Sequence, residues 1–247
     1  NPYRFEAIIS NNGSSTQDVS MVTEVYDLTN QYVTFSDLTS PLTLPTGQQD
    51  TFALPLAWTP SNIGSYEAKI WGSGTASSTD TVYKQIEMTN YTYGKDNNVF
   101  DGGYWVSNAQ TQNYITSWYD IYANEDLHAI DVFISPATTA GTSIHAVLYE
   151  EDIYNFGNPI FLDQSDDYII SASDVGNWIT IPFTTPFSLQ SGISYSVGVG
   201  GYLHPSDTLA IGTSGNSLGT ENRLFDQIGA YNNGMPQWYY ILNIPMI

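Results

Sequence analysis

Acidic and amide side chains gather in three short stretches of the chain, and oxygen-ligated calcium is the chemistry they suggest. Carboxylate, amide and backbone carbonyl oxygens are the ligands that Ca²⁺ prefers. Gly102 and Gly103 follow the first stretch and allow the tight backbone that carbonyl ligation needs. The alternatives are turns in which Asp and Asn cap their own backbone, or solvated acidic faces. The predicted calcium ligands are Asp96, Asn98, Asp101, Glu150, Asp152, Asp163, Asp166 and Asp167.

Residues for acid–base or nucleophilic catalysis form no recognisable pattern. The three histidines, His128, His145 and His204, show no spacing typical of a zinc site, and there is no Gly-x-Ser-x-Gly elbow. His128 and His145 each share a strand face with apolar residues, which favours structural roles. The many carboxylates include no pair that the sequence singles out for glycoside hydrolysis. We therefore predict that the protein is not an enzyme.

Aromatic residues are abundant, with 19 Tyr, 10 Phe and 6 Trp, and exposed rings on a β-scaffold can stack on sugars. Tyr202 and Tyr231 lie beside Gly and Asn in loop-like sequence, so we predict them as ligand-binding residues. Core packing is the alternative for any single aromatic residue. The other rings available for binding are Tyr104, Trp105, Trp118, Tyr119, Trp238 and Tyr239.

The charge balance excludes some classes of partner. The 247 residues include 25 acidic and 5 basic side chains, a formal net charge of −20. Nucleic acids and anionic membrane surfaces are both recognised through Lys and Arg, so neither is expected as a partner. The chain has no cysteine, and no apolar run approaches the roughly 20 residues of a membrane helix.

The elements that must position these residues are strands. Short runs alternate between apolar and polar residues and are separated by Gly-, Pro- and Asn-rich turns, as in Val19–Tyr26 and Ser143–Tyr149. No stretch shows a long apolar period of 3.6 residues. We predict an all-β protein with an immunoglobulin-like sandwich over 1–92 and a larger jelly-roll-like sandwich over 93–247.

Two resemblances refine this prediction. The motifs Phe5–Ser15, Leu44–Asp50 and Gly64–Ala68 resemble adhesion-type immunoglobulin-like modules of bacterial surface proteins. In the second segment, Trp178–Phe183, Tyr195–Tyr202 and Ile211–Gly215 follow one another as in a module of large secreted proteins of Bacteroidota, a type often exported by the type IX secretion system. This resemblance implies an extracellular or cell-surface location and a longer precursor. It also implies O-glycosylation at Asp-Thr-aliphatic sequences, here Thr81 and Thr208.

The sequence therefore favours a non-catalytic extracellular module that acts in adhesion, extracellular assembly or spacing. The alternative is a carbohydrate-binding module, calcium-dependent or not, that accompanies a polysaccharide-degrading enzyme. The expected partners are other extracellular protein modules, glycans or further copies of the chain, without membrane insertion.

Overall fold

The computed structural model describes residues 2–74, 80–151, 159–216 and 222–247. Within these residues every regular element is a β-strand and there is no helix, which confirms the predicted all-β class. The chain forms two compact units, Asn1–Tyr93 and Gly94–Ile247, and each is described here by itself.

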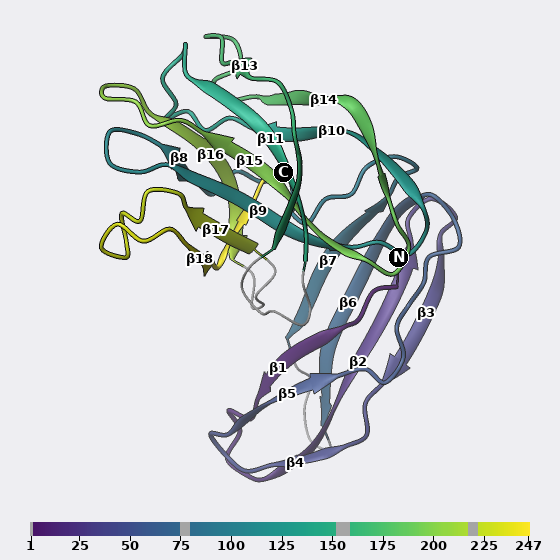
Figure 1. Ribbon diagram of the computed structural model, residues 1–247. Coiled ribbons are helices and arrows are strands. Elements are labelled where there is room, and N and C mark those ends of the chain that lie inside the picture. Colours follow the sequence, from purple (N-terminus) through teal and green to yellow (C-terminus); the bar gives the residue numbers. More distant parts are fainter. Residues whose placement is uncertain (1, 75–79, 152–158, 217–221) are drawn as a thin grey trace. The chain divides into compact units, whose positions relative to one another are not determined.

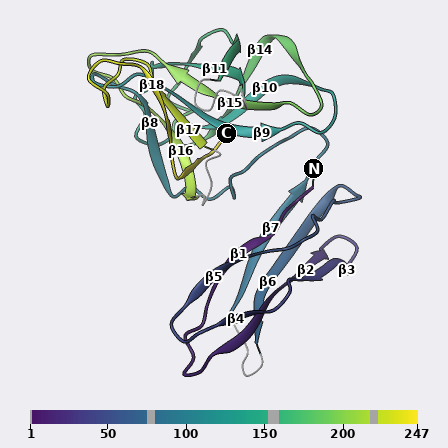
Figure 2. The same ribbon diagram turned by 60° about the horizontal axis from the view of Figure 1, so that its bottom comes forward.

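The first unit packs two sheets against each other (Figures 1 and 2). Strand β1 pairs with β5, and the larger sheet has the order β3-β2-β6-β7, with β4 also paired to β2. The core between them contains Met21, Phe52, Trp58 and Tyr66. The strands are β1 (Glu6–Ser10), β2 (Gln17–Asp27), β3 (Tyr32–Leu38), β4 (Leu42–Leu44), β5 (Gln49–Ala53), β6 (Gly64–Gly74) and β7 (Thr81–Met88).

The described residues of the second unit form twelve strands in three sheets. They are β8 (Gly102–Ser107), β9 (Asn113–Asp120), β10 (Glu125–Phe133), β11 (Ser143–Glu150), β12 (Ile160–Gln164), β13 (Tyr168–Ile169), β14 (Trp178–Leu189), β15 (Ser194–Gly201), β16 (Leu209–Asn216), β17 (Asn222–Asp226), β18 (Gln237–Tyr240) and β19 (Asn243–Pro245).

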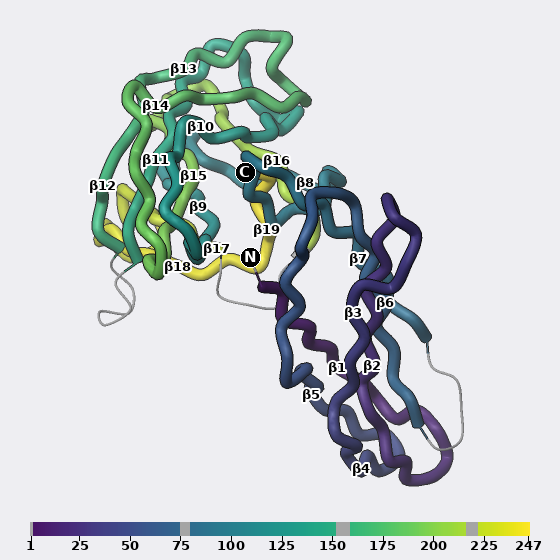
Figure 3. The backbone as a smooth tube through the Cα atoms, turned by 90° about the vertical axis from the view of Figure 1, so that its right-hand side faces the viewer, coloured from purple at the N-terminus to yellow at the C-terminus, as the bar shows by residue number. Residues whose placement is uncertain are grey.

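The largest sheet of the second unit has the order β12-β11-β15-β9-β17-β18, with β13 also paired to β11 (Figure 3). The other sheets are β10-β14 and β19-β16-β8. Alternate residues such as Ile115, Leu148 and Val199 point from the largest sheet into the core, where they meet Ile130, Ile181 and Ile211 from the smaller sheets. The opposite face of the largest sheet carries the residues considered next.

Two local predictions were wrong, and a third was confirmed in part. The alternation of apolar and polar residues over Thr51–Trp58 predicts one strand, but β5 ends at Ala53, before Pro55. Proline lacks the N–H that a continuing ladder needs. His128 was expected on a buried face, but it is exposed because the register of β10 against β14 shifts between Leu127 and Ala129. His145 is buried as expected, yet neither ring nitrogen has a hydrogen-bond partner.

Candidate functional site

The outer face of the seven-stranded sheet carries a continuous cluster of rings, which we call the ring cluster. Its members come from five strands and the segment after β15. They are Tyr114, His145, Tyr149, Phe161, Tyr202, Phe225 and Trp238. Neighbouring ring centroids lie 5.0–6.0 Å apart, mostly in tilted or edge-to-face geometry. Such pairs stabilise beyond the area they bury, so the cluster holds its rings in fixed orientations.

The ring cluster shows that this face is concave. Tyr149 on β11 and Trp238 on β18 have ring centroids 5.2 Å apart, although β15, β9 and β17 lie between their strands. Neighbouring strands are about 4.8 Å apart, so a flat sheet would separate β11 from β18 by about 19 Å. Two side chains can close that gap only if the sheet bends toward them.

Glycines in β15 make room for the rings. Gly198 and Gly200 are the cross-strand neighbours of Thr116 and Tyr114 on the concave face. A Cβ atom on Gly200 would lie 2.3 Å from Cδ1 of Tyr114 and 2.6 Å from Nε2 of His145. At Gly200 the rings of Tyr114 and His145 therefore lie against the backbone of β15, whereas a Cβ atom on Gly198 would meet the backbone of Ile115 and Thr116.

A buried ion pair lies on the same face. Nη1 of Arg223 is 2.7 Å from Oε2 of Glu151, and both side chains are almost fully buried. The guanidinium lies between the rings of Trp118 and Tyr240, each centroid 5.1 Å from Cζ. Ser196 donates a hydrogen bond to the other oxygen of Glu151. The pair neutralises both charges, and the two stacked rings gain cation–π attraction.

At the other side of the ring cluster, His145 and Tyr202 meet Asp167. The hydroxyl of Tyr202 donates to Oδ1 of Asp167 at 2.9 Å, and Nδ1 of His145 lies 3.6 Å from the same oxygen. Burial lowers the pKa of His145, and the negative charge of Asp167 partly opposes that shift. Burial also raises the pKa of the Tyr149 and Tyr114 phenols, so these hydroxyls stay protonated.

Two of the predicted calcium ligands of the first stretch, Asp96 and Asn98, accept hydrogen bonds from N–H groups of the protein. Oδ1 of Asp96 accepts the backbone N–H of Asn98, and Oδ1 of Asn98 accepts the indole N–H of Trp178 at 3.1 Å. Asp101 is exposed, and its backbone N–H donates to Thr213. The turn-capping alternative therefore describes Asp96.

The acidic residues of the other two stretches point to separate neighbours. Oδ1 of Asp163 accepts the backbone N–H of Gln164, and Oδ2 of Asp166 accepts the hydroxyl of Thr184. Asp167 belongs to the concave face, as described above. Glu150 ends β11 and is half-buried, whereas Asp152 lies outside the described residues. In the part of the chain that the structure describes, no group of three His, Cys, Asp or Glu side chains could hold a metal.

The remaining predicted site residues lie in different places. Tyr202 is part of the ring cluster through its contact with His145 and is 44% exposed, whereas Tyr231 packs edge-on against Tyr239. Thr81 is exposed at the start of β7. Thr208 is half-buried before β16, with its backbone N–H donating to Oγ1 of Thr139.

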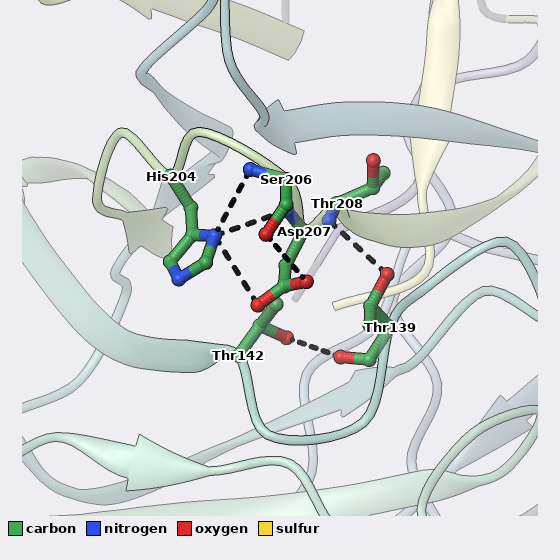
Figure 4. Close-up of polar contacts among 6 residues, drawn as sticks. All are labelled: Thr139, Thr142, His204, Ser206, Asp207 and Thr208. Atoms are coloured by element: carbon green, nitrogen blue, oxygen red, sulfur yellow. Dashed lines mark hydrogen bonds and ion pairs between the residues drawn. The ribbon is translucent and has the colours of Figure 1, made fainter.

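Figure 4 shows the surroundings of His204, the one place where Ser, His and Asp side chains meet among the described residues. Nδ1 of His204 accepts the backbone N–H of Asp207 at 3.0 Å and lies 3.2 Å from its Oδ2. The hydroxyl of Ser206 donates to Oδ1 of Asp207, and not to the imidazole. The hydroxyl is therefore not activated by the histidine, and the contacts stabilise a turn.

The sequence analysis named Trp118 and Trp238 among the available rings but missed Tyr114, Tyr149, Phe161 and Phe225. The signal was present in the alternation. Tyr114, Thr116 and Trp118 share one face of β9, and Gly198 and Gly200 share the matching face of β15. Small and large residues at facing positions indicate rings lying across a strand.

Comparison with known proteins gave no relative. No protein-family model matches the chain, and no curated protein or solved structure matches it significantly. Among the described residues, no helix is long and apolar enough to cross a membrane.

Proposed function

We propose that this protein is a non-catalytic binding module of an extracellular or cell-surface protein, and that it binds a glycan chain on the concave face of the second unit. The observation that carries the proposal is the ring cluster, whose outer members remain open to solvent. Phe161 is 52% exposed and Tyr202 is 44% exposed, while the rings between them are buried or half-buried.

Pre-oriented rings suit a sugar ligand. The apolar faces of pyranose rings stack on aromatic side chains, and rings that are already fixed lose little conformational entropy on binding. The ring of Tyr149 contacts that of Phe161, and the ring of His145 contacts that of Tyr202; Tyr114 in turn contacts both Tyr149 and His145. The carboxylate of Asp167 at the rim can accept sugar hydroxyl groups, since its exposed side chain has oxygen lone pairs to spare.

The charge of the protein narrows the glycan class. The second unit holds 16 of the 25 acidic residues and two basic ones, Lys95 and Arg223. Arg223 is already paired with Glu151. Repulsion therefore disfavours glycans that carry carboxylate or sulfate groups, and we propose a neutral polysaccharide.

The first unit fits a role in spacing or contact with other modules. We propose an immunoglobulin-like sandwich as the fold of the first unit, since two sheets pack around its core, and a jelly-roll-like sandwich for the second unit. The larger sheet of the first unit exposes Val33, Leu38 and Tyr83 on its outer face. This supports adhesion or extracellular assembly as the context of the glycan-binding unit.

The test is a glycan array with neutral and acidic polysaccharides, followed by titration calorimetry on the best ligand. We expect binding to neutral glycans, and at least about fivefold weaker affinity in Phe161→Ala and Tyr202→Ala, because each removes a stacking ring worth more than about 1 kcal/mol. Tyr122→Ala is the matched control, since Tyr122 is 54% exposed and its ring has no contact with the ring cluster. Equal affinity in the rim variants and the control, or an array without neutral ligands, would overturn the proposal.

A further inference from the structure

Two fully buried oxygen-bearing side chains face each other across strands β9 and β17, outside the ring cluster. Asn113 and Asp226 are cross-strand partners, and both have 0% of their surface exposed. Because cross-strand partners point to the same face, their side chains are neighbours. That face is the core side of the sheet, since Ile115 and Leu224, two residues along each strand, belong to the core.

Each side chain is fixed by one hydrogen bond and leaves one oxygen without a donor. Nδ2 of Asn113 donates to the carbonyl of Trp105 at 3.1 Å. Oδ2 of Asp226 accepts the backbone N–H of Tyr231 at 2.8 Å. The other two oxygens, Oδ1 of Asn113 and Oδ1 of Asp226, accept no hydrogen bond from the described residues. The buried Oγ1 of Thr111 also has no hydrogen-bond partner among these residues.

The two strand residues do not satisfy each other. The amide group of Asn113 donates to the carbonyl of Trp105, and the two remaining oxygens are both acceptors when Asp226 carries its negative charge. The next residue, Gln227, follows the end of β17, and its Oε1 accepts a hydrogen bond from the side-chain amide of Gln112. Its Nε2 has no hydrogen-bond partner in the part of the chain that the structure describes, so it does not donate to either of the two oxygens. A cation or a hydrogen-bond donor close to both oxygens would satisfy them.

The charge of Asp226 decides between a cation and a neutral donor. An uncompensated carboxylate in a protein interior is among the most costly groups to bury. No ion pair of the described residues includes Asp226, and the basic residue on the same strand, Arg223, already pairs with Glu151. A water molecule would supply hydrogen bonds but leave the negative charge.

We propose that Asp226 and Asn113 form the centre of a binding site for a hard metal cation, with Thr111 and backbone carbonyls as further oxygen ligands. One carboxylate, an amide oxygen and a hydroxyl are ligands that suit Ca²⁺. The site has no imidazole or thiolate, so soft transition metals are disfavoured. It is separate from the acidic stretches that the sequence indicated. The cation would join β9 and β17 to the Tyr231 loop, because Asp226 also holds the backbone of that loop.

The test measures the melting temperature of the protein in chelator, in millimolar Ca²⁺ and in Na⁺ against choline chloride. Binding to the folded state raises stability by RT ln(1 + [L]/Kd). For a unit of this size, Ca²⁺ at one hundred times its Kd raises the melting temperature by about 5–10 °C. We expect that shift in the wild type and its loss in Asp226→Asn, whose new amide can donate to Asn113. Asp101→Asn is the matched control and keeps the shift, since Asp101 is exposed.

A second variant keeps the test decisive if Asp226→Asn does not fold. Asn113→Asp adds a second carboxylate beside Asp226, so it should lower stability in chelator and enlarge the Ca²⁺ shift. If the melting temperature rises in Na⁺ but not in Ca²⁺, and Asp226→Asn or Asn113→Asp changes that rise, the result supports a monovalent cation bound by the same ligands. Equal melting temperatures in chelator, Ca²⁺ and Na⁺, or a shift that neither variant changes, would overturn the proposal.

Discussion

The buried ion pair between Arg223 and Glu151 should be the most sensitive polar contact of the second unit. Arg223→Met replaces the guanidinium with an apolar side chain of similar length that still fits between Trp118 and Tyr240. It leaves the almost fully buried carboxylate of Glu151 hydrogen-bonded to the hydroxyl of Ser196 but without a counter-charge.

The expected loss follows from burial and charge. Removing one partner of a buried ion pair costs about 3–5 kcal/mol, because the other charge stays in a low-dielectric site. Two cation–π contacts are also lost, each about 0.5–2 kcal/mol. Sulfur–aromatic contacts of the methionine offset part of that loss, at about 0.3–1.5 kcal/mol each. We expect Arg223→Met to lower the free energy of unfolding by about 3–5 kcal/mol.

The assay is urea denaturation of the wild type, Arg223→Met, Glu151→Gln and the double variant. The double variant should be more stable than the sum of the single losses predicts, because it leaves no uncompensated charge. Lys69→Met is the control for a surface pair. Lys69 is 3.9 Å from Glu67 with 39% of its side chain exposed, so a loss within about 1 kcal/mol is expected. A loss below about 1 kcal/mol in Arg223→Met, or additive single losses, would refute the reasoning.

Two further predictions concern the ring cluster. Gly200→Ala places a Cβ atom 2.3 Å from Cδ1 of Tyr114, so it should lower the free energy of unfolding by about 1–3 kcal/mol and weaken glycan binding. An unchanged midpoint of urea denaturation would contradict the close packing at this glycine. The folded-state pKa of His145 is lowered by burial, so the unfolded state takes up a proton first as the pH falls. Stability from this group is therefore complete above about pH 6.5 and is lost below it. His145→Gln should be relatively more stable at about pH 5.5 than at about pH 7.5, and a difference from wild type that does not vary with pH would speak against it.

Local alternation was enough to predict strands, because a half-buried strand needs apolar residues at every second position. Val19, Met21 and Val25 alternate in the sequence and are buried along β2. Proline was a less certain guide. β14 runs from Trp178 to Leu189 through two prolines, which it tolerates because it pairs on one side with β10 and needs few of its N–H groups on the other.

The candidate sites were less accessible to sequence reasoning. Asp96, Asn98 and Asp163 look like metal ligands by type and spacing, yet their oxygens accept hydrogen bonds from nearby donors. Asp226, in contrast, stands alone in the sequence without an acidic neighbour. Its importance comes from burial beside Asn113, which only strand pairing can reveal.

The sequence by itself determined the class of fold, the acidic charge, and a supply of rings and oxygen ligands. Alternation and composition are local properties, so they can be read without the fold. Only the tertiary structure decided which rings and charges meet. Tyr149 and Trp238 are far apart in the chain and four strands apart in the sheet, and they touch because the sheet curves over the glycines of β15. Curvature and burial depend on all the packed strands together, so no single stretch of sequence records them.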